Sequence, residues 1–358
     1  MPRPSSASCD VQLADFTTLR LGGPARSFVA ASTDDELIAA VRAADDAGEP
    51  LLILGGGSNL VVSDDGFDGT VVQVLTRGIS RDGGPGELTV AAGEDWDALV
   101  ARTVAEHLAG LECLSGIPGL AGATPIQNVG AYGQEVADTV TAVRVWDRVG
   151  RAVLTMPADQ CGFGYRTSVF KRDAEHRFVV LAVTFRLATQ TLSAPVRYSE
   201  LAATLGIAPG GQAESTEVRS AVIELRQRKG MVIDPADPDT RSAGSFFLNP
   251  VVGSAALARV EAAAQARYGP GTVVPRFPAG DGQVKLPAAW LIERAGFTKG
   301  YTQGDGVRVS TKHTLALVNS GSATTAALLA LAREIRDGVH ATFGVTLTPE
   351  PTLINTAL

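Results

Sequence analysis

The segment SGIPGLAGATPIQNVGAYGQE, residues 115–135, contains five glycines and a single charged side chain. It lacks both the period of about 3.6 residues that marks an amphipathic helix and the alternation that marks a strand, and glycines weaken both elements. Glycines do allow positive φ angles and let backbone N–H groups approach a ligand closely. The alternative is a plain connecting loop, but loops of this length are usually functional. We therefore predict that the segment holds a large polar ligand, with Gln127 and Asn128 supplying amide groups.

A second glycine cluster, residues 55–57, follows the apolar run PLLIL of residues 50–54 and precedes Ser58 and Asn59. Consecutive backbone N–H groups in such a turn form a nest for an anionic oxygen. The cluster is not a dinucleotide-binding G-x-G-x-x-G motif, because its sixth position is a leucine and residues 60–62 look extended; the chain also lacks a P-loop motif. The pattern predicts a strand–nest–strand phosphate site.

The composition is that of an ordinary globular protein of two or three domains, with 358 residues, 45% hydrophobic and 19% charged. A net charge of −7 argues against nucleic-acid or membrane-surface binding. The three cysteines and four histidines show no disulfide-scaffold or metal-ligand spacing, so no metal site is predicted. The N-terminus shows no signal peptide and no apolar run approaches about 20 residues, so we expect a cytoplasmic protein.

Strands and helices are expected to mix without regular βαβ alternation, which favours α+β subdomains over one doubly wound sheet. The clearest helix is residues 33–47, where Thr33 and Glu36 match a capping box and Gly48 ends the pattern. Another is expected at 95–109, stopped by Gly110. The other predicted elements are strands at 51–54, 70–75, 140–147 and 178–187, helices at 217–230, 285–296 and 322–339, and a turn-rich loop at 233–240.

Arg166 lies in the segment GFGYRTS, between aromatic residues and glycines. Its guanidinium could clamp a carboxylate or enolate through two hydrogen bonds, or it could be a surface side chain stacked on Tyr165. The motif alone leaves both readings open.

Ser245 lies in GSFFLNP, outside any G-x-S-x-G motif, so a hydrolase nucleophile is not indicated. Its hydroxyl becomes a proton donor only toward a strongly basic carbon such as an enolate, and a lone serine is more often a turn residue. Glu350 is fixed between two prolines, and Lys312 and His313 by themselves indicate a surface pair more than a base.

Taken together, these segments resemble the UDP-N-acetylenolpyruvoylglucosamine reductase (MurB) family. Its FAD domain belongs to the class named after p-cresol methylhydroxylase (PCMH) and vanillyl-alcohol oxidase. The resemblance spans nearly the whole chain beyond residue 15. The matching pieces are TLRLGGPA (18–25), LGGGSNLVV (54–62), residues 115–136, CGFGYRTSVFK (161–171), RQRK (226–229), AGSFFLNP (243–250), KLPAAWLIERAGF (285–297), KHTLALVN (312–319) and LTPEP (347–351).

The resemblance implies a PCMH-type FAD-binding fold of two α+β subdomains plus a C-terminal α+β substrate-binding domain. The expected divisions are a disordered tail at 1–14, one FAD-binding subdomain at 15–75 with 344–358 returning to it, a second at 76–218, and the substrate-binding domain at 219–343.

The implied reaction is the NADPH-dependent reduction of the enolpyruvyl ether of UDP-N-acetylglucosamine to UDP-N-acetylmuramate in peptidoglycan precursor synthesis. Hydride would come from FAD N5 and the proton from Ser245, while Arg166 and Glu350 would stabilise the enolic intermediate. FAD is expected to be non-covalent, because neither glycine segment contains a tethering His or Cys. The expected partner is a nucleotide-sugar, with no nucleic acid and no membrane, and we expect a monomer.

The resemblance also assigns binding residues by position. Phe277 stands where some members have a tyrosine over the substrate diphosphate, so that hydroxyl contact is missing. The FAD contacts are expected at Gly55, Gly56, Gly57, Ser58, Asn59, Leu60, Gly116, Ile117, Pro118, Gly119, Gly122, Ala123, Gln127, Asn128, Gly130 and Ala131, and the substrate contacts at Tyr132, Tyr165, Tyr198, Lys229, Asn249, Phe277 and His313.

Two other functions fit part of the sequence. A PCMH-type FAD oxidase that uses O₂ on a sugar or lactone would fit residues 50–135. A non-catalytic nucleotide-binding module would fit the glycine clusters, but it leaves the motifs around Arg166, Ser245 and Glu350 unexplained.

Overall fold

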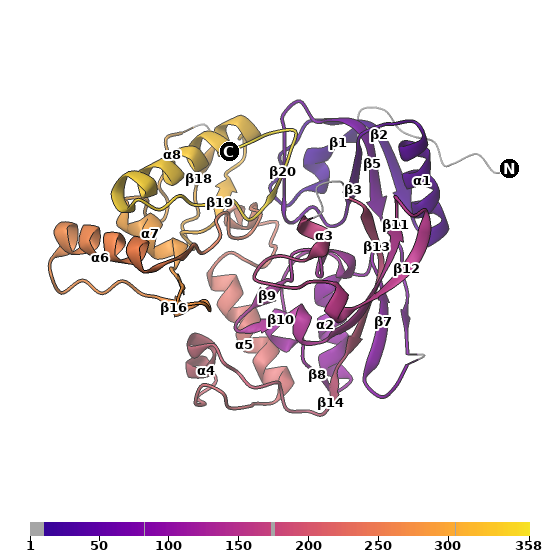
Figure 1. Ribbon diagram of the computed structural model, residues 1–358, viewed down its shortest axis with the longest axis horizontal. Coiled ribbons are helices and arrows are strands. Elements are labelled where there is room, and N and C mark those ends of the chain that lie inside the picture. The colour runs from indigo at the N-terminus through magenta and orange to yellow at the C-terminus, as the bar shows by residue number, and fades with distance from the viewer. Residues whose placement is uncertain (1–10, 82, 173–175, 305) are drawn as a thin grey trace. The chain divides into compact units, whose positions relative to one another are not determined.

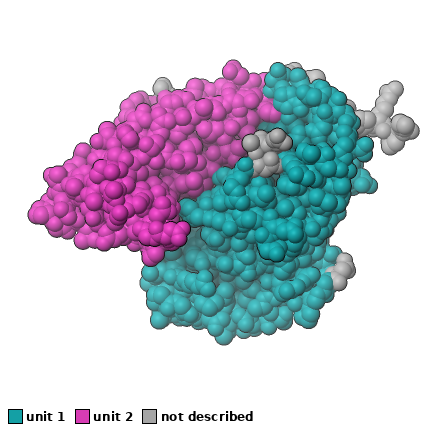
Figure 2. Space-filling view, in the orientation of Figure 1, with its two compact units in different colours: residues 1–11, 25–57, 68–232 teal, residues 12–24, 58–67, 233–358 magenta. Residues whose placement is uncertain are grey.

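The computed structural model describes residues 11–81, 83–172, 176–304 and 306–358. These residues form two compact units, coloured separately in Figure 2. Unit 1 comprises residue 11 and residues 25–57 and 68–232, and unit 2 comprises residues 12–24, 58–67 and 233–358. Each unit is therefore assembled from segments that are distant in the sequence.

Unit 1 is built around a five-stranded antiparallel sheet in the order β12-β11-β13-β7-β6. The central strand β13 is buried over most of its length, as its apolar sequence FVVLAVTFR requires. The strands of this sheet are β6 (Ile79–Ser80), β7 (Glu87–Ala91), β11 (Val140–Asp147), β12 (Ala152–Pro157) and β13 (Phe178–Arg186).

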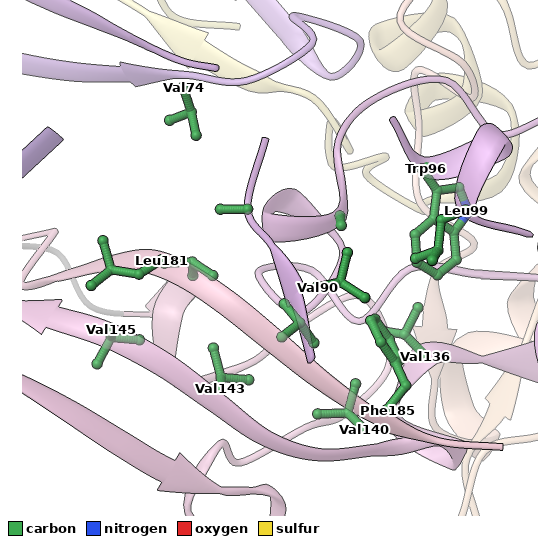
Figure 3. Packing of buried hydrophobic residues seen from close by; sticks show 14 of the residues in the cluster. Val74, Val90, Trp96, Leu99, Val136, Val140, Val143, Val145, Leu181 and Phe185 are labelled. Atoms are coloured by element: carbon green, nitrogen blue, oxygen red, sulfur yellow. The ribbon is translucent and has the colours of Figure 1, made fainter. Parts of the chain in front are cut away.

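The core of unit 1 lies against this sheet and the helix α2 (Trp96–Ala105), and Figure 3 shows its packing. Trp96 is fully buried, and its ring centroid lies 5.9 Å from that of Phe185 on β13. Its indole N–H donates to Leu114 O at 3.1 Å, so the one polar atom of the ring is satisfied. The sheet and the start of α2 thus form one packed body.

A four-stranded sheet, β1-β2-β5-β3, lies at the N-terminal end of the chain, and the helix α1 connects two of its strands (Figure 1). Thr33 caps α1 by accepting from Glu36 N at 3.2 Å, but the Glu36 carboxylate accepts from Ser32 N instead of Thr33 N, so the predicted capping box forms only in part. The bounds are β1 (Val11–Gln12), β2 (Pro24–Ala31), α1 (Asp34–Asp46), β3 (Leu51–Leu54) and β5 (Phe67–Val74).

The predicted helix at 95–109 is wrong at its C-terminal end. The chain leaves the helix after Ala105, His107 adopts a left-handed φ of 58°, and the next residues form a strand, β8, that pairs with β14. The smaller elements of unit 1 are β8 (Leu108–Ala109), η2 (Glu112–Leu114), η3 (Ala121–Ala123), β9 (Gly130–Ala131), β10 (Gln134–Glu135), η4 (Val136–Asp138), η5 (Ala158–Gln160), α3 (Val169–Arg172), β14 (Ala188–Thr189), α4 (Ser199–Thr204) and α5 (Ser215–Arg228).

Unit 2 packs three helices, α6, α7 and α8, with the antiparallel hairpin β18–β19. The helix α8 begins where the Asp64 carboxylate accepts from Thr325 N and Ala326 N, and it ends at Gly344 with a φ of 67°. The elements of unit 2 are η1 (Leu13–Phe16), β4 (Leu60–Val62), η6 (Pro238–Thr240), β15 (Val251–Val252), α6 (Ser254–Tyr268), β16 (Phe277–Pro278), β17 (Val284–Lys285), α7 (Ala288–Arg294), β18 (Val307–Val309), β19 (Leu317–Asn319), α8 (Thr325–Phe343) and β20 (Thr352–Ile354).

The C-terminal strand β20 pairs in parallel with β4, the strand that follows the glycine cluster of residues 55–57. Residues 1–10 of the expected tail lie outside the described residues, whereas residues 11–14 form β1 and the start of η1. None of the helices in the described ranges is both long and apolar enough to span a bilayer.

The buried carboxylate of Asp147 makes the stability of unit 1 dependent on pH. Arg177 donates to it through Nε at 2.7 Å and Nη2 at 2.5 Å, and together with hydrogen bonds from Gly150 N and Val149 N this lowers the pKa of Asp147 to about 2 against the effect of desolvation. Stability from such a group is present above its unfolded-state pKa of about 3.9 and is lost as the pH falls through the folded-state value.

We expect Asp147→Asn to lower the free energy of unfolding at neutral pH and to flatten its fall between about pH 4 and pH 2, because an amide cannot titrate. Urea denaturation at both ends of that range measures the effect. Asp46→Asn is the matched control, because Asp46 pairs with Arg151 at an exposed site. Parallel pH curves for wild type and Asp147→Asn would contradict this account.

Candidate functional site

The two glycine segments singled out from the sequence touch each other in unit 1. A Cβ atom on Gly56 would lie 2.8 Å from Gly119 Cα, a distance that real Cβ atoms do not adopt. Gly57 has a left-handed φ of 60°. The turn after β3 and the loop beginning at residue 115 therefore meet backbone to backbone, which only glycine permits.

The loop that begins at residue 115 is hydrogen-bonded to the residues that begin α2. Gly119 O accepts from Trp96 N at 3.1 Å, and Gly116 N donates to the Asp97 carboxylate at 2.6 Å. Asp97 is also held by Arg219 of α5 through two hydrogen bonds of 2.6 and 2.9 Å. These bonds fix the loop to two helices, so its exposed backbone groups have a set direction.

Some of these glycines have a packing reason that does not involve a ligand. A Cβ on Gly122 would lie 2.4 Å from Ala92 Cβ, and one on Gly116 would lie 2.8 Å from Ile223 Cδ1. The predicted FAD contacts at these two positions stay predictions, whereas their need for glycine is explained by the protein itself.

The prediction that residues 115–135 lack regular structure is wrong at its C-terminal end. Gly130–Ala131 and Gln134–Glu135 form a short antiparallel hairpin, and the two residues between these strands, Tyr132 and Gly133, both have positive φ angles. Such a two-residue turn matches the twist of a hairpin. The indication in the sequence was Gly133 in the two-residue turn, and such a signal is weak when the two strands that pair are not known.

Asn128 is a buried residue whose side chain is used inside the protein. Its Nδ2 donates to Glu135 at 2.7 Å and to Gly164 O at 3.1 Å, and its Oδ1 accepts from Ala137 N. The amide predicted to face FAD thus holds the 162–168 segment against the hairpin. A cofactor contact at this residue would fall to its backbone.

Arg166 is half-buried and is fixed by the same loop. Its Nη2 donates to Gly130 O at 2.5 Å and its Nη1 to Asn128 O at 3.5 Å. The guanidinium carbon also lies 5.6 Å from the Tyr165 ring centroid, so stacking and anchoring occur together. The backbone of Arg166 adopts a left-handed φ of 52°. Arg166 is therefore a preorganised cation.

Three predicted substrate residues gather near the helices α4 and α5. The Tyr132 and Tyr198 rings meet edge to face with centroids 5.4 Å apart. Lys229 Nζ lies 5.8 Å from the Tyr132 ring centroid and pairs with Glu200 at 2.7 Å. Burial raises the pKa of Tyr132 to about 12, so its hydroxyl stays protonated and can donate a hydrogen bond.

In unit 2 the segments carrying Ser245 and Glu350 are paired with each other. Glu350 N donates to Phe246 O at 2.9 Å, and Leu248 N donates to Thr348 O at 3.0 Å. Phe246 N in turn donates to Leu315 O at 2.7 Å. Phe246, the residue after Ser245, is thus hydrogen-bonded through both its N–H and its C=O, and no pattern in the sequence indicated this pairing.

The other predicted substrate residues of unit 2 are placed separately. Asn249 Oδ1 accepts from Ala288 N at 2.8 Å and so caps α7, a role that the sequence did not indicate. Phe277 lies on β16 opposite Lys285 and is 53% exposed. His313 is half-buried, and its backbone N–H donates to Ser310 Oγ at 3.2 Å.

The other predicted FAD residues lie in turns or at element ends. Gln127 Oε1 accepts from Lys171 Nζ at 3.5 Å, and Asn59 O accepts from Thr352 N at 2.9 Å. Gly55, Ser58 and Pro118 lie in the turns, Ile117 packs against the core, Leu60 begins β4, Ala123 ends η3 and Ala131 ends β9. The residues that the structure describes contain no group of three His, Cys, Asp or Glu side chains that could hold a metal ion.

Two family models match the chain. The FAD binding domain model matches residues 25–155, and the model of the UDP-N-acetylenolpyruvoylglucosamine reductase C-terminal domain matches residues 234–354. A curated UDP-N-acetylenolpyruvoylglucosamine reductase of Thermobifida fusca is 55% identical over 357 residues, covering 99% of each chain. That of Saccharopolyspora erythraea is 58% identical over 350 residues, covering 97% of this chain and 95% of the relative.

The chain belongs to the UDP-N-acetylenolpyruvoylglucosamine reductase family. The solved structure of the Thermus caldophilus family member (MurB) matches 98% of this chain and 100% of its own, with a TM-score of 0.66 and 26% identity. The α+β class and the PCMH-type FAD-binding fold that the resemblance implied are thereby confirmed. The glycine cradle at Gly56 and Gly119 lies within the residues that match the FAD binding domain.

The contact between the two glycine segments gives a direct test of this family's cofactor cradle. We expect Gly56→Ala to lower the free energy of unfolding of the flavin-free protein by about 1–3 kcal/mol, because the new methyl group forces backbone against backbone. Gly55→Ala is the matched control, since its Cβ would meet only Leu120 Cδ1 at 3.7 Å and neither glycine has a positive φ. Equal stability of the two variants in urea denaturation would contradict the contact.

Proposed function

We propose that this chain reduces the enolpyruvyl ether of UDP-N-acetylglucosamine to UDP-N-acetylmuramate, with FAD as cofactor and NADPH as reductant. The observation that carries the residue assignment is the backbone pairing of the Ser245 segment with the Glu350 segment, in which Glu350 N donates to Phe246 O. This pairing brings the backbone of Glu350, which carries a carboxylate, next to that of Phe246, the residue that follows the Ser245 hydroxyl in the sequence. Family membership supplies the reaction in which such a pair is useful.

The chain's own residues fit FAD. The backbone N–H groups of Gly55–Gly57, with those of Ile117 and Gly119, are suited to hold its anionic diphosphate, because the Gly56–Gly119 contact leaves no side chain between the two loops. When bound, FAD supplies the hydride that reduces the vinyl carbon of the substrate. Neither loop contains a His or Cys, which supports non-covalent binding.

Arg166 is suited to stabilise charge on the substrate. Addition of hydride to the terminal vinyl carbon puts negative charge on the adjacent carbon and its carboxylate. A guanidinium already fixed by Gly130 O and Asn128 O needs little reorganisation to offset that charge, and such preorganised electrostatic stabilisation is often the largest catalytic contribution.

Ser245 is assigned as the proton donor to the adjacent carbon, which leaves a lactyl ether. Gly244, with a φ of 74°, precedes it in a turn, and the paired Phe246 peptide follows it, so its position is fixed on both sides. Glu350 is assigned with Arg166 to the stabilisation of the enolic intermediate.

The diphosphate of the nucleotide-sugar is assigned to Lys229, with Tyr132, Tyr165 and Tyr198 as further contacts. The ammonium of Lys229 provides the charge, and the phenol of Tyr132 provides a hydrogen-bond donor. Asn249, Phe277 and His313 are the proposed contacts from unit 2. Phe277 can pack against the substrate but cannot donate a hydrogen bond.

We retain three further proposals. The FAD-binding subdomains are residues 15–75, with 344–358 returning, and residues 76–218, and the substrate-binding domain is 219–343. The protein acts as a cytoplasmic monomer. The oxidase and the non-catalytic nucleotide-binding functions are not favoured, because the relatives that match nearly the full chain are named as reductases.

If Ser245 is the proton donor, its replacement by alanine should slow only one of the two half-reactions. Reduction of the flavin by NADPH needs no proton at the substrate carbon, so Ser245→Ala should keep that rate near wild type. Reoxidation by the enolpyruvyl substrate should slow by about 10²–10⁴-fold, the usual contribution of a positioned general acid.

Stopped-flow absorbance of the flavin measures both steps in one preparation. Ser245→Cys is the matched variant, because a thiol can donate a proton where a methyl group cannot, and it should recover part of the loss. Equal slowing of both half-reactions in Ser245→Ala would assign the residue a structural role.

A further inference from the structure

The loop that leads to Ser245 carries a buried carboxylate with no role in the assigned chemistry. Asp239 lies in the 3-10 helix η6 (Pro238–Thr240) of unit 2 and is 2% exposed. The loop is closed on itself, because Thr240 Oγ1 donates to Asp234 O or Asp237 O, each at 2.8 Å. Asp239 is therefore presented from a compact turn.

The Asp239 carboxylate connects the strand β18 to the turn that follows it in the hairpin β18–β19. Its Oδ1 accepts from Arg308 Nη2 at 3.0 Å and from Thr311 N at 3.4 Å, and its Oδ2 accepts from the Thr311 hydroxyl. These hydrogen bonds lower the pKa of Asp239 although desolvation opposes them, so the group is a carboxylate at neutral pH. It joins Arg308, in the middle of β18, to Thr311 at the beginning of the turn.

The turn of the hairpin is itself ordered around Ser310, a fully buried residue. Its Oγ accepts from Lys312 N at 3.0 Å and from His313 N at 3.2 Å. Ser310 N donates to Ala316 O at 2.8 Å and closes the turn. Fixing Thr311 through Asp239 therefore fixes the backbone of the residues that follow, including His313.

The same turn supports the segment that carries Ser245. Leu315 O, within the turn, accepts from Phe246 N, and Asn319 N donates to Arg241 O at 3.0 Å. The chain from η6 to Phe246 thus runs along the hairpin and is attached to it near both ends. Asp239 is bonded to the hairpin at the η6 end of this segment, and Ser245 lies at the other end.

We propose that Asp239 is a positioning residue for proton transfer: its carboxylate, bonded to Thr311 and Arg308, sets the hairpin turn on which the Phe246 peptide and so the Ser245 hydroxyl are placed. The proposal rests on the proposed function, since it assigns Asp239 a role through Ser245. Asp239 does not touch the substrate.

The central variant is Asp239→Asn, which keeps the size of the side chain but removes its charge and turns one acceptor into a donor facing Arg308 or Thr311. Reoxidation of the reduced flavin by the enolpyruvyl substrate should slow by about 10–100-fold, the cost of displacing a reacting group by a fraction of an ångström to about 1 Å. Flavin reduction by NADPH should stay within about 2-fold of wild type.

Asp237→Asn is the matched control. It removes the same charge from the same loop, where Asp237 Oδ1 accepts from Asp239 N at 3.0 Å, a bond that the asparagine oxygen can keep, and it breaks only the ion pair with the exposed ammonium of Lys312 at 2.5 Å. Its reoxidation rate should stay within about 3-fold of wild type, as expected for a surface ion pair. If Asp239→Asn does not fold, Thr311→Val removes one hydrogen bond while the Arg308 pair remains, and it should slow reoxidation in the same direction by a smaller factor.

The decisive readout is the double variant with Ser245→Ala. If Asp239 acts through Ser245, adding Asp239→Asn to Ser245→Ala should slow reoxidation by less than about 2-fold, because the hydroxyl that it positions is already absent. If the two losses multiply, or if both half-reactions slow together in Asp239→Asn, the residue is merely structural and the proposal is overturned. Failure of the wild-type protein to reduce the enolpyruvyl ether would instead overturn the proposed function.

Discussion

The steric contact between Gly56 and Gly119 is the constraint on which the rest of unit 1 depends. The two backbone segments can approach this closely only because residue 56 carries no Cβ at the point of contact. The loop after Gly119 is bonded in turn to the start of α2, whose first residue, Trp96, is packed in the core of the five-stranded sheet. The cofactor cradle and the hydrophobic core are therefore parts of one connected structure.

The glycines of this chain have two different tasks, and the sequence alone does not separate them. Gly122 is required because Ala92 occupies the space of a side chain, and Gly116 because its φ of 71° disfavours one. Gly56 is required by its contact with Gly119 and Gly57 by its left-handed φ of 60°, and both lie in the turn that we propose presents backbone N–H groups to FAD. Substitution would be harmful in both groups, so a count of glycines in the sequence does not tell which of them would face a ligand.

Local patterns predicted the elements whose stability is local. The helix α1 has a cap and an apolar face within its own residues, and the strands β3 and β11 are mainly apolar runs; all three form within one residue of the predicted places. The helix α6 was missed because few of its residues are buried, so it lacks an apolar stripe. The pairing of the Ser245 segment with the Glu350 segment and the bonds of Asp239 could not be predicted, because each joins segments whose contact only the fold creates. The family resemblance assigned Ser245 and Glu350, whereas only the geometry of the folded chain pointed to Asp239.

The central claim, that this chain is a flavoenzyme that reduces an enolpyruvyl ether, is tested most directly by an anaerobic titration. The purified protein is reduced with one equivalent of NADPH and then mixed with enolpyruvyl UDP-N-acetylglucosamine in the absence of oxygen. We predict that the yellow absorbance of oxidised FAD returns in proportion to the substrate added, one equivalent for one. An absorbance that returns only when O₂ is admitted would contradict the account and indicate an oxidase.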